Sequence, residues 1–403
     1  MIVETHVTGL SARRLEYITE HLDRNYVSKG KIAGCQTLVA RHGQVAYFKS
    51  LGYADLAQQA PMADDTIFRI YSMTKPITSI ALMGLWEQGY FQLSDPISRF
   101  LPGWEEMTVY VAGEHDAMET RPAARPITFR HVLSHTAGLS YGFSNHPVDR
   151  AYGGAAVIRG NGETLAGFVE KLGKLPLMYD PGDRWMYSYA TDVCGFLVET
   201  ISGVPFDRYL RETIFEPLGM VDTSFWVEPE KLPRLAANYM RGPDKSLNLI
   251  DDPANSSYAK EPTFFSGGGG LVSTTADYLR FAEALRRGGE LDGERIIGPR
   301  TLQMMTRNHL PNGNHLAASA IGLFSETKYE GIGFGLGFAS TLDGVAAGIP
   351  CEGEFYWGGA ASTYFWVDPK EDLVAIFMTQ LMPSTTFDFR GQLKDIVYAA
   401  IQD

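Results

Sequence analysis

The hydrophobic pattern at the start of the chain has the period of a helix. Apolar residues at Leu15, Ile18, Leu22 and Tyr26 recur at the spacing that places them on one helix face. The pattern therefore predicts a helix that begins after Ser11 and packs its apolar face on a sheet.

Residues 35–54 change to the pattern of strands. Two runs rich in β-branched and aromatic residues flank His42 and Gly43, a pair suited to the tight turn of a hairpin. Residues 74–89, in contrast, are apolar on most sides and carry Pro76, which a helix tolerates only in its first turn. We therefore expect a hairpin, followed by a buried helix that starts near Ser72.

The pattern changes twice more toward the end of the chain. The region from residue 90 to residue 264 is rich in proline, glycine and short helical segments, without long alternating strands. Strand patterns return after the glycine run 267–270, first in short segments and then in a hairpin over 354–380 that turns at Asp368 and Pro369. A helical pattern over 389–402 follows.

This order of elements predicts an α+β fold, in which an antiparallel sheet is flanked by helices and a mostly helical lobe is inserted. We expect residues 1–75 and 265–403 to form one α/β domain built from both ends of the chain. Residues 76–264 then form the inserted helical domain, with the active site between the two. A chain of 403 residues, 45% hydrophobic and 20% charged, is long enough for a large core.

Composition excludes several kinds of partner. The net charge of -12 is spread along the chain without a Lys/Arg run, which argues against nucleic acid and anionic membrane surfaces. No apolar stretch approaches the ~20 residues that span a bilayer, and the first residues lack the apolar core of a secretory signal, so we expect a cytoplasmic protein. Cys35, Cys194 and Cys351 form no C-x-x-C pair, so neither a disulfide framework nor a zinc site is predicted.

A candidate nucleophile stands at the start of the buried helix. The pattern S-x-x-K occurs four times, but only Ser72 and Lys75 lie between an apolar extended run, 66–71, and an apolar helix. A serine hydroxyl needs a neighbour that takes its proton, and a lysine does so only where burial and a helix N-terminus disfavour its ammonium form. The alternative is that Ser72 is an ordinary N-cap and Lys75 a solvated first-turn residue.

Two later segments carry further candidates, each with a structural alternative. Tyr187 follows a Pro-Gly turn and precedes an apolar helix, so it either packs in the core or faces a cleft as a partner acid or base. Gly358 and Gly359 interrupt a late strand, which indicates either a bulge or a closely approaching ligand. In the second case the backbone N–H groups of Ala360 and Ser72 would form an oxyanion hole.

The motifs together resemble those of one superfamily. In order along the chain stand YSMTK at 71–75, LSHTAGL at 133–139, PGDRWMYS at 181–188, GGGGLVST at 267–274 and WGGAAST at 357–363. This series resembles the serine β-lactamases and D,D-peptidases, and within them most closely the family VIII carboxylesterases, which are similar to class C β-lactamases. The resemblance implies a β-lactamase-like fold, Ser72 as nucleophile, Lys75 and Tyr187 as shared acid and base, and Ser72 and Ala360 as oxyanion donors.

Two departures from class C β-lactamases bear on the substrate. Tyr189 replaces the asparagine of the Y-x-N motif, and Trp357 replaces the lysine of K-T-G. Both losses favour a neutral, apolar acyl substrate over a β-lactam. We expect Trp357, Gly358, Gly359 and Tyr189 to contact substrate, and aromatic residues that include Tyr141 and Phe143 to line the pocket.

Other signals are weak. His131 and His135 have a spacing that zinc sites use on a helix, but no third ligand is near, and the glycine run 267–270 lacks the frame of a phosphate loop. The prediction is a carboxylesterase that acts on a small-molecule ester through an acyl-Ser72 intermediate, without metal or cofactor. An acyltransferase, a β-lactamase or D,D-peptidase-type amidase, and a non-catalytic sensor of the same fold are the alternatives. The sequence predicts neither the natural substrate nor the oligomeric state.

Overall fold

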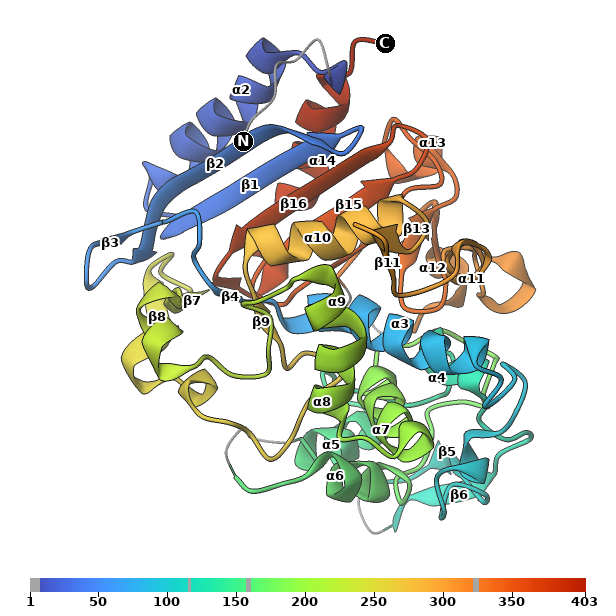
Figure 1. Cartoon of the computed structure of the whole chain (residues 1–403). Coiled ribbons are helices and arrows are strands. Elements are labelled where there is room, and N and C mark those ends of the chain that lie inside the picture. Colours follow the sequence, from blue (N-terminus) through green and yellow to red (C-terminus); the bar gives the residue numbers. More distant parts are fainter. Residues whose placement is uncertain (1–7, 115–116, 157–160, 322–325) are drawn as a thin grey trace.

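The first and last strands of the chain lie side by side in one sheet. The computed structural model describes residues 8–114, 117–156, 161–321 and 326–403. Its eight-stranded antiparallel sheet has the order β12-β13-β14-β15-β16-β1-β2-β3 (Figure 1). The strands are β1 (Gly34–Arg41), β2 (Gln44–Asp55), β3 (Ala60–Pro61), β12 (Ile332–Phe334), β13 (Ala339–Thr341), β14 (Phe355–Gly358), β15 (Tyr364–Asp368) and β16 (Leu373–Thr379).

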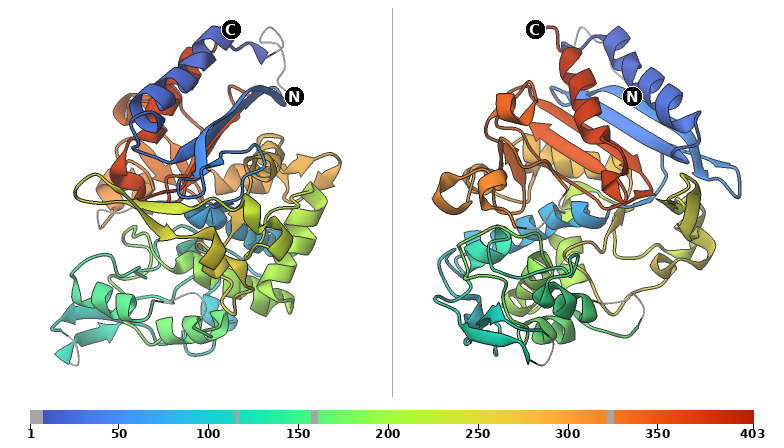
Figure 2. Two further views of the ribbon diagram at one scale, coloured as in Figure 1. Left: turned by 90° about the vertical axis from the view of Figure 1, so that its left-hand side faces the viewer. Right: turned by 180° about the vertical axis from the view of Figure 1, so that it is seen from behind.

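Helices cover both faces of this sheet. On one face α2 (Ala12–Leu22) lies beside α14 (Phe389–Ala399), and α10 (Thr275–Arg286) lies on the other (Figures 1 and 2). β1 and β16 are consequently buried along their whole length. The predicted first helix is confirmed with its apolar face inward, and it continues through a π-helical turn over Asp23–Val27.

The segment predicted as one C-terminal hairpin has three strands. β14 and β15 pair antiparallel, and β15 pairs in turn with β16. The predicted turn at Asp368 separates β15 from β16, and the chain makes a further turn after Gly358. Gly359 donates its N–H to the carbonyl of Thr363 (2.9 Å) in that turn. The two glycines therefore end a strand, where the sequence pattern placed them inside one.

The middle of the chain is mainly helical. Helix α3 (Thr74–Glu87) crosses between the sheet and a group of helices in the lower half of Figure 1. These are α4 (Phe129–Leu133), α5 (Pro147–Gly154), α6 (Leu165–Leu172), α7 (Ala190–Ser202), α8 (Phe206–Leu210) and α9 (Glu216–Leu218). Near β12 lie three short helices, α11 (Pro299–Met305), α12 (Leu316–Ser319) and α13 (Gly344–Ala347). No helix among the described residues is long and apolar enough to cross a membrane.

Several short strands were not predicted. They are β5 (Thr108–Ala112) with β6 (Glu119–Pro122), β7 (Asn238–Arg241) with β8 (Leu247–Asp251) and β17 (Leu381–Met382), and β10 (Glu290–Leu291) with β11 (Glu294–Arg295). β6 is exposed along its whole length and β8 has no buried residue. Such strands lack the alternation of apolar and polar residues by which a half-buried strand is recognised.

A two-stranded pairing leads the chain to Ser72. β4 (Phe68–Arg69) pairs with β9 (Val272–Ser273), so the strand pattern after the glycine run lies here rather than in the central sheet. Arg69 is fully buried, and its Nε donates to Asp251 (2.7 Å). This pairing fixes the backbone immediately before the candidate nucleophile.

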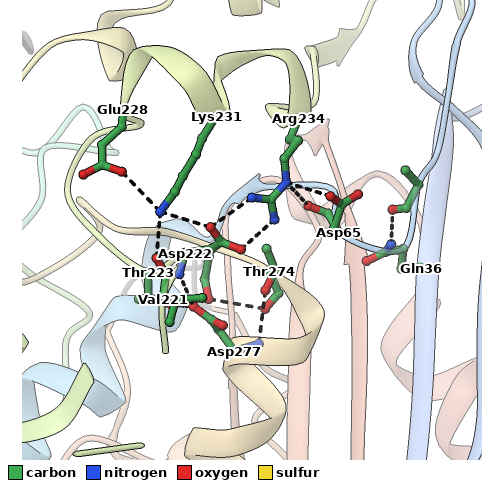
Figure 3. A network of polar contacts seen from close by, with 12 residues as sticks. Gln36, Asp65, Val221, Asp222, Thr223, Glu228, Lys231, Arg234, Thr274 and Asp277 are labelled. Carbon is green, nitrogen blue, oxygen red and sulfur yellow. Dashed lines mark hydrogen bonds and ion pairs between the residues drawn. The ribbon is translucent and has the colours of Figure 1, made fainter. Parts of the chain in front are cut away.

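Charged side chains fix the segment between α9 and β7 to this region (Figure 3). Arg234 forms ion pairs with Asp222 (2.6 Å) and with Asp65 (2.9 Å), which precedes β4. Asp277, in the first turn of α10, accepts a hydrogen bond from the backbone N–H of Asp222 (2.7 Å). The network thus joins the entry to β4 with the helix that follows β9.

Candidate active site

Ser72 lies at a sharp turn between β4 and α3. Tyr71 has a left-handed backbone (φ 43°), a conformation that costs a non-glycine residue about 1–2 kcal/mol. Its hydroxyl accepts a hydrogen bond from the Asn238 side chain (2.9 Å), which holds the residue in place. Ser72 follows in a short 3-10 helix over Tyr71–Met73, and its side chain reaches the wall of a cavity.

Lys75 lies one turn after Ser72, and its amine contacts the serine hydroxyl. Nζ donates to Ser72 Oγ (3.3 Å), to the hydroxyl of Tyr141 (2.8 Å) and to the carbonyl oxygen of Gly268 (2.6 Å). The side chain is 1% exposed, and burial lowers the pKa of the amine to about 8. A useful fraction of Lys75 is consequently neutral near pH 7 and able to accept a proton.

Tyr187 completes a hydrogen-bonded group around Ser72. Its hydroxyl is hydrogen-bonded to the Ser72 side chain and accepts a bond from Nε1 of Trp357 (3.4 Å). The Lys75 amine lies over its ring, 4.6 Å from the centroid. Burial raises the pKa of Tyr187 well above its ordinary value, so the phenol keeps its proton at neutral pH. Lys75 is therefore suited to act as base and Tyr187 as acid.

Asp192 was not predicted from the sequence. It lies in the first turn of α7, is buried, and accepts hydrogen bonds from the Ser266 hydroxyl (2.6 Å) and the Gly268 N–H (3.1 Å). Its negative charge raises the pKa of Lys75 and so opposes the effect of burial. Asp192 is the single charged residue in the apolar run 190–198. An isolated charge of this kind also singled out Lys75, so the sequence did contain a signal for Asp192.

The predicted second oxyanion donor lies at the same cavity. Ala360 lines the cavity together with Ser72, and within the described chain its N–H donates to no protein group. The glycines before it make room for protein atoms: a Cβ at Gly358 would collide with the Arg390 guanidinium, and one at Gly359 with the carbonyl oxygen of Ile70. Close packing therefore explains why both positions carry glycine, and the Ala360 N–H stays available to a ligand.

The cavity has a volume of about 430 Å³, and eight of its 18 lining residues are aromatic. Of the predicted substrate contacts, Tyr141, Phe143 and Tyr189 line the cavity. Phe143 is 61% exposed, and its ring stacks on that of Tyr141 with 4.9 Å between the centroids. Trp357 is fully buried behind Tyr187, and neither it nor Gly358 or Gly359 belongs to the described lining. The sequence missed other lining residues, among them Phe168, Asp192, Tyr258, Gly268 and Glu326.

His135 has a structural position. Helix α4 ends at Leu133, so His131 and His135 do not share a helix face as expected, and His135 has a left-handed backbone (φ 55°). Its ring is hydrogen-bonded to Ser188 (3.2 Å) and Thr191 (3.4 Å) rather than to the backbone. Burial, followed by the charge of Lys75, lowers the pKa of His135 well below its ordinary value, which keeps the ring neutral.

Comparison with known proteins gives one consistent family. The β-lactamase family model matches residues 17–399. Esterase EstB of Burkholderia gladioli is 30% identical over 396 residues, which cover 92% of this chain and 91% of that protein. Two solved structures are also similar over nearly their whole length.

The first is EstCE1, a hydrolase with promiscuous acyltransferase activity, with a TM-score of 0.78 and 28% identity over 97% of this chain and 99% of that one. The second is unliganded simvastatin synthase from Aspergillus terreus, with a TM-score of 0.80 and 26% identity over 96% of this chain and 98% of that one. Both carry the fold that the motifs predicted. The chain therefore belongs to the β-lactamase family, in which it is a serine hydrolase similar to the family VIII esterases.

Proposed function

We propose that the protein is a carboxylesterase that hydrolyses esters of apolar, short-to-medium acyl groups through an acyl-Ser72 intermediate. The observation that carries the proposal is the contact of Ser72 with both a buried lysine amine and a buried phenol at the wall of an aromatic cavity. A serine activated in this way attacks acyl carbonyls.

The proposed reaction assigns one proton transfer to each group. Neutral Lys75 takes the proton of Ser72 as Oγ bonds to the ester carbonyl carbon, and the N–H groups of Ser72 and Ala360 stabilise the oxyanion. As the carbonyl re-forms, the alkoxide leaves with the proton of Tyr187, which Lys75 then replaces. Water then gives a proton to neutral Lys75 as its oxygen bonds to the acyl carbon. The bond from Oγ to that carbon breaks, the acid leaves, and Ser72 takes the proton of Tyr187, which Lys75 replaces.

The walls of the cavity support a neutral substrate. None of the described residues that line it is an arginine or a lysine, and the nearby Lys75 amine is engaged by three acceptors. A substrate carboxylate, such as a β-lactam carries, would therefore lose its hydration without gaining a charged partner. Aromatic walls suit an apolar acyl or alcohol group.

Acyl transfer is the second candidate. It is favoured by the two structural neighbours, since one is described as a hydrolase with promiscuous acyltransferase activity and the other as a synthase. The same acyl-Ser72 species would then be resolved by an alcohol. Butyl butyrate formed from p-nitrophenyl butyrate in the presence of butanol, measured against free butyrate, gives the share of transfer.

The test of the proposal is the mass of the protein after brief incubation with p-nitrophenyl butyrate. We expect a butyryl adduct and a burst of p-nitrophenol in the wild type, and neither in Ser72→Ala. Ser28→Ala is the matched control, because Ser28 also begins an S-x-x-K sequence but lies on the surface. Activity that survives in Ser72→Ala would refute the assignment of the nucleophile.

A further inference from the structure

Glu326 is a fully buried carboxylate at the wall of the catalytic cavity, which it lines together with Tyr187 and Ala360. Its Oε2 accepts a hydrogen bond from Nη2 of Arg390 (2.5 Å), and its backbone carbonyl accepts from Nη1 of the same side chain. The other carboxylate oxygen, Oε1, is buried and has no hydrogen-bond partner among the residues that the structure describes. Leaving a buried acceptor unpaired destabilises the folded protein, so such an oxygen needs an explanation.

A second carboxylate nearby has both oxygens paired, whereas the buried Glu283, which pairs with Arg286 away from the catalytic cavity, also keeps one unpaired oxygen. Glu354 is equally buried and pairs with Lys394, the other cation of α14 that faces this region. Both of its oxygens are used: Oε1 accepts from Lys394 and from Thr341, and Oε2 accepts from the hydroxyl of Tyr398 (2.8 Å). Within the described chain, both oxygens of Glu354 are therefore paired, and one oxygen of Glu326 is not.

Glu326 lies between two cavities, and its unpaired oxygen is Oε1. Glu326 also lines a neighbouring cavity of about 340 Å³, and Arg390 lines that neighbour but is not among the described residues of the catalytic one. Oε2 is bonded to Arg390. Oε1 is closed to water, so a ligand in the catalytic cavity reaches it only when a side chain of the wall moves aside. The charge of Glu326 raises the pKa of both Tyr187 and Lys75, which places it near the groups that handle the proton of the leaving oxygen.

We infer that Oε1 of Glu326 accepts a hydrogen bond from a hydroxyl group on the alcohol portion of the substrate. The inference rests on the proposed ester chemistry and narrows its substrate class to esters of hydroxylated alcohols. The alcohol portion is chosen because Tyr187, whose phenol gives the leaving alkoxide its proton, lines the same cavity. Glu326 is then a specificity-determining residue, and its negative charge also disfavours carboxylate-bearing esters.

Matched pairs of butyrate esters test this inference. Esters of ethylene glycol, 1,3-propanediol and 1,4-butanediol, each with one free hydroxyl, are compared with the propyl, butyl and pentyl esters of the same length. Release of butyrate gives kcat/KM for each, and the ratio within a pair isolates recognition of the hydroxyl. A change in the pKa of Tyr187 or Lys75 affects both members of a pair alike and cancels.

We expect the wild type to favour the hydroxylated member of at least one pair. In Glu326→Leu that ratio falls by about 10- to 100-fold, the factor of a hydrogen bond to a charged group. Glu326→Gln keeps an acceptor of the same shape and retains part of the ratio, which guards against a leucine variant that does not fold. Glu354→Gln, the matched control, removes the other buried carboxylate and leaves the ratio unchanged.

The outcomes separate this inference from the proposed function. Hydrolysis of both esters at ratios that neither Glu326 variant changes would overturn the role of Glu326 and leave the esterase proposal standing. A wild-type preference for the alkyl member of every pair would do the same. Failure of the wild type to hydrolyse any of these esters would overturn both.

Discussion

Replacing Asp192 by asparagine removes one negative charge near Lys75 and preserves the surrounding hydrogen bonds. Oδ1 of Asp192 accepts from the Ser266 hydroxyl (2.6 Å) and the Gly268 N–H (3.1 Å), and an asparagine carbonyl oxygen accepts both bonds. Lys75 donates to the carbonyl of the same glycine (2.6 Å). The substitution therefore changes the charge near the amine with little change in geometry.

The size of the effect follows from the pKa of Lys75. Burial lowers it from 10.5 to about 8, and Asp192 is the first of the two carboxylates that oppose this lowering. An opposite charge at close range shifts a pKa by about 1–3 units, so we expect about 7 or lower in Asp192→Asn. The neutral fraction at pH 6 then rises from about 1% to about 9%, so kcat/KM at pH 6, relative to its alkaline plateau, rises about ninefold.

The assay is kcat/KM for p-nitrophenyl butyrate as a function of pH. In the wild type it rises with pH and levels off above about 8, because the base is the deprotonated amine. Asp277→Asn is the matched control, since Asp277 is also a buried carboxylate in the first turn of a helix. An acidic limb that stays in place in Asp192→Asn, or moves to higher pH, would refute the coupling of Asp192 to a Lys75 base.

Three further substitutions test other parts of the site. Tyr187→Phe removes the proton donor, so we expect kcat to fall by about 10²- to 10⁴-fold at an unchanged thermal unfolding temperature; a loss below about tenfold would contradict its role. Lys75→Met abolishes esterase activity without lowering the free energy of unfolding at pH 7. The reason is that burial of the charged amine destabilises the folded state by roughly 3 kcal/mol at that pH. Urea unfolding measures this, and a clear destabilisation would contradict it. Gly359→Ala forces a Cβ onto the carbonyl of Ile70 and lowers the free energy of unfolding by about 1–3 kcal/mol, whereas Gly154→Ala, which meets no atom within 4 Å, does not. Equal stability of the two alanine variants would refute the packing argument.

The sequence predicted those features that local patterns determine. The α+β fold and the family are confirmed, because apolar periodicity marks the first helix and the buried α3, and the motifs stand in the family order. The structure brings Ser72, Lys75 and Tyr187 together. Ser72 and Lys75 are neighbours on one helical turn, so their contact follows from spacing alone, whereas Tyr187 was placed there only by the resemblance. Their catalytic roles stay predictions.

Long-range contacts account for what the sequence did not predict. Asp192 and Glu326 act on Lys75 from segments far away in the chain. Both lie in or beside a motif, Asp192 just after PGDRWMYS and Glu326 inside the fourth S-x-x-K sequence, but neither motif assigns them a role. The carbonyl of Ile70, which lies between β4 and the nucleophile, leaves no room for a side chain at Gly359. Such contacts depend on how the ends of β4 and β14 pack together, and hydrophobic periodicity does not predict this packing.

Trp357 links the substrate preference of the site to its choice of base. In the class C β-lactamase pattern this position carries a lysine, whose charge next to the catalytic tyrosine would lower the pKa of the phenol. Trp357 instead offers Tyr187 a neutral hydrogen bond (3.4 Å). Arg390, a cation that lowers the pKa of Tyr187, is paired with Glu326. Burial, followed by the charge of Glu326, outweighs these two effects and raises the pKa of Tyr187 well above its ordinary value. The tryptophan that removes a partner for substrate carboxylates thus also leaves Lys75 as the group able to deprotonate Ser72.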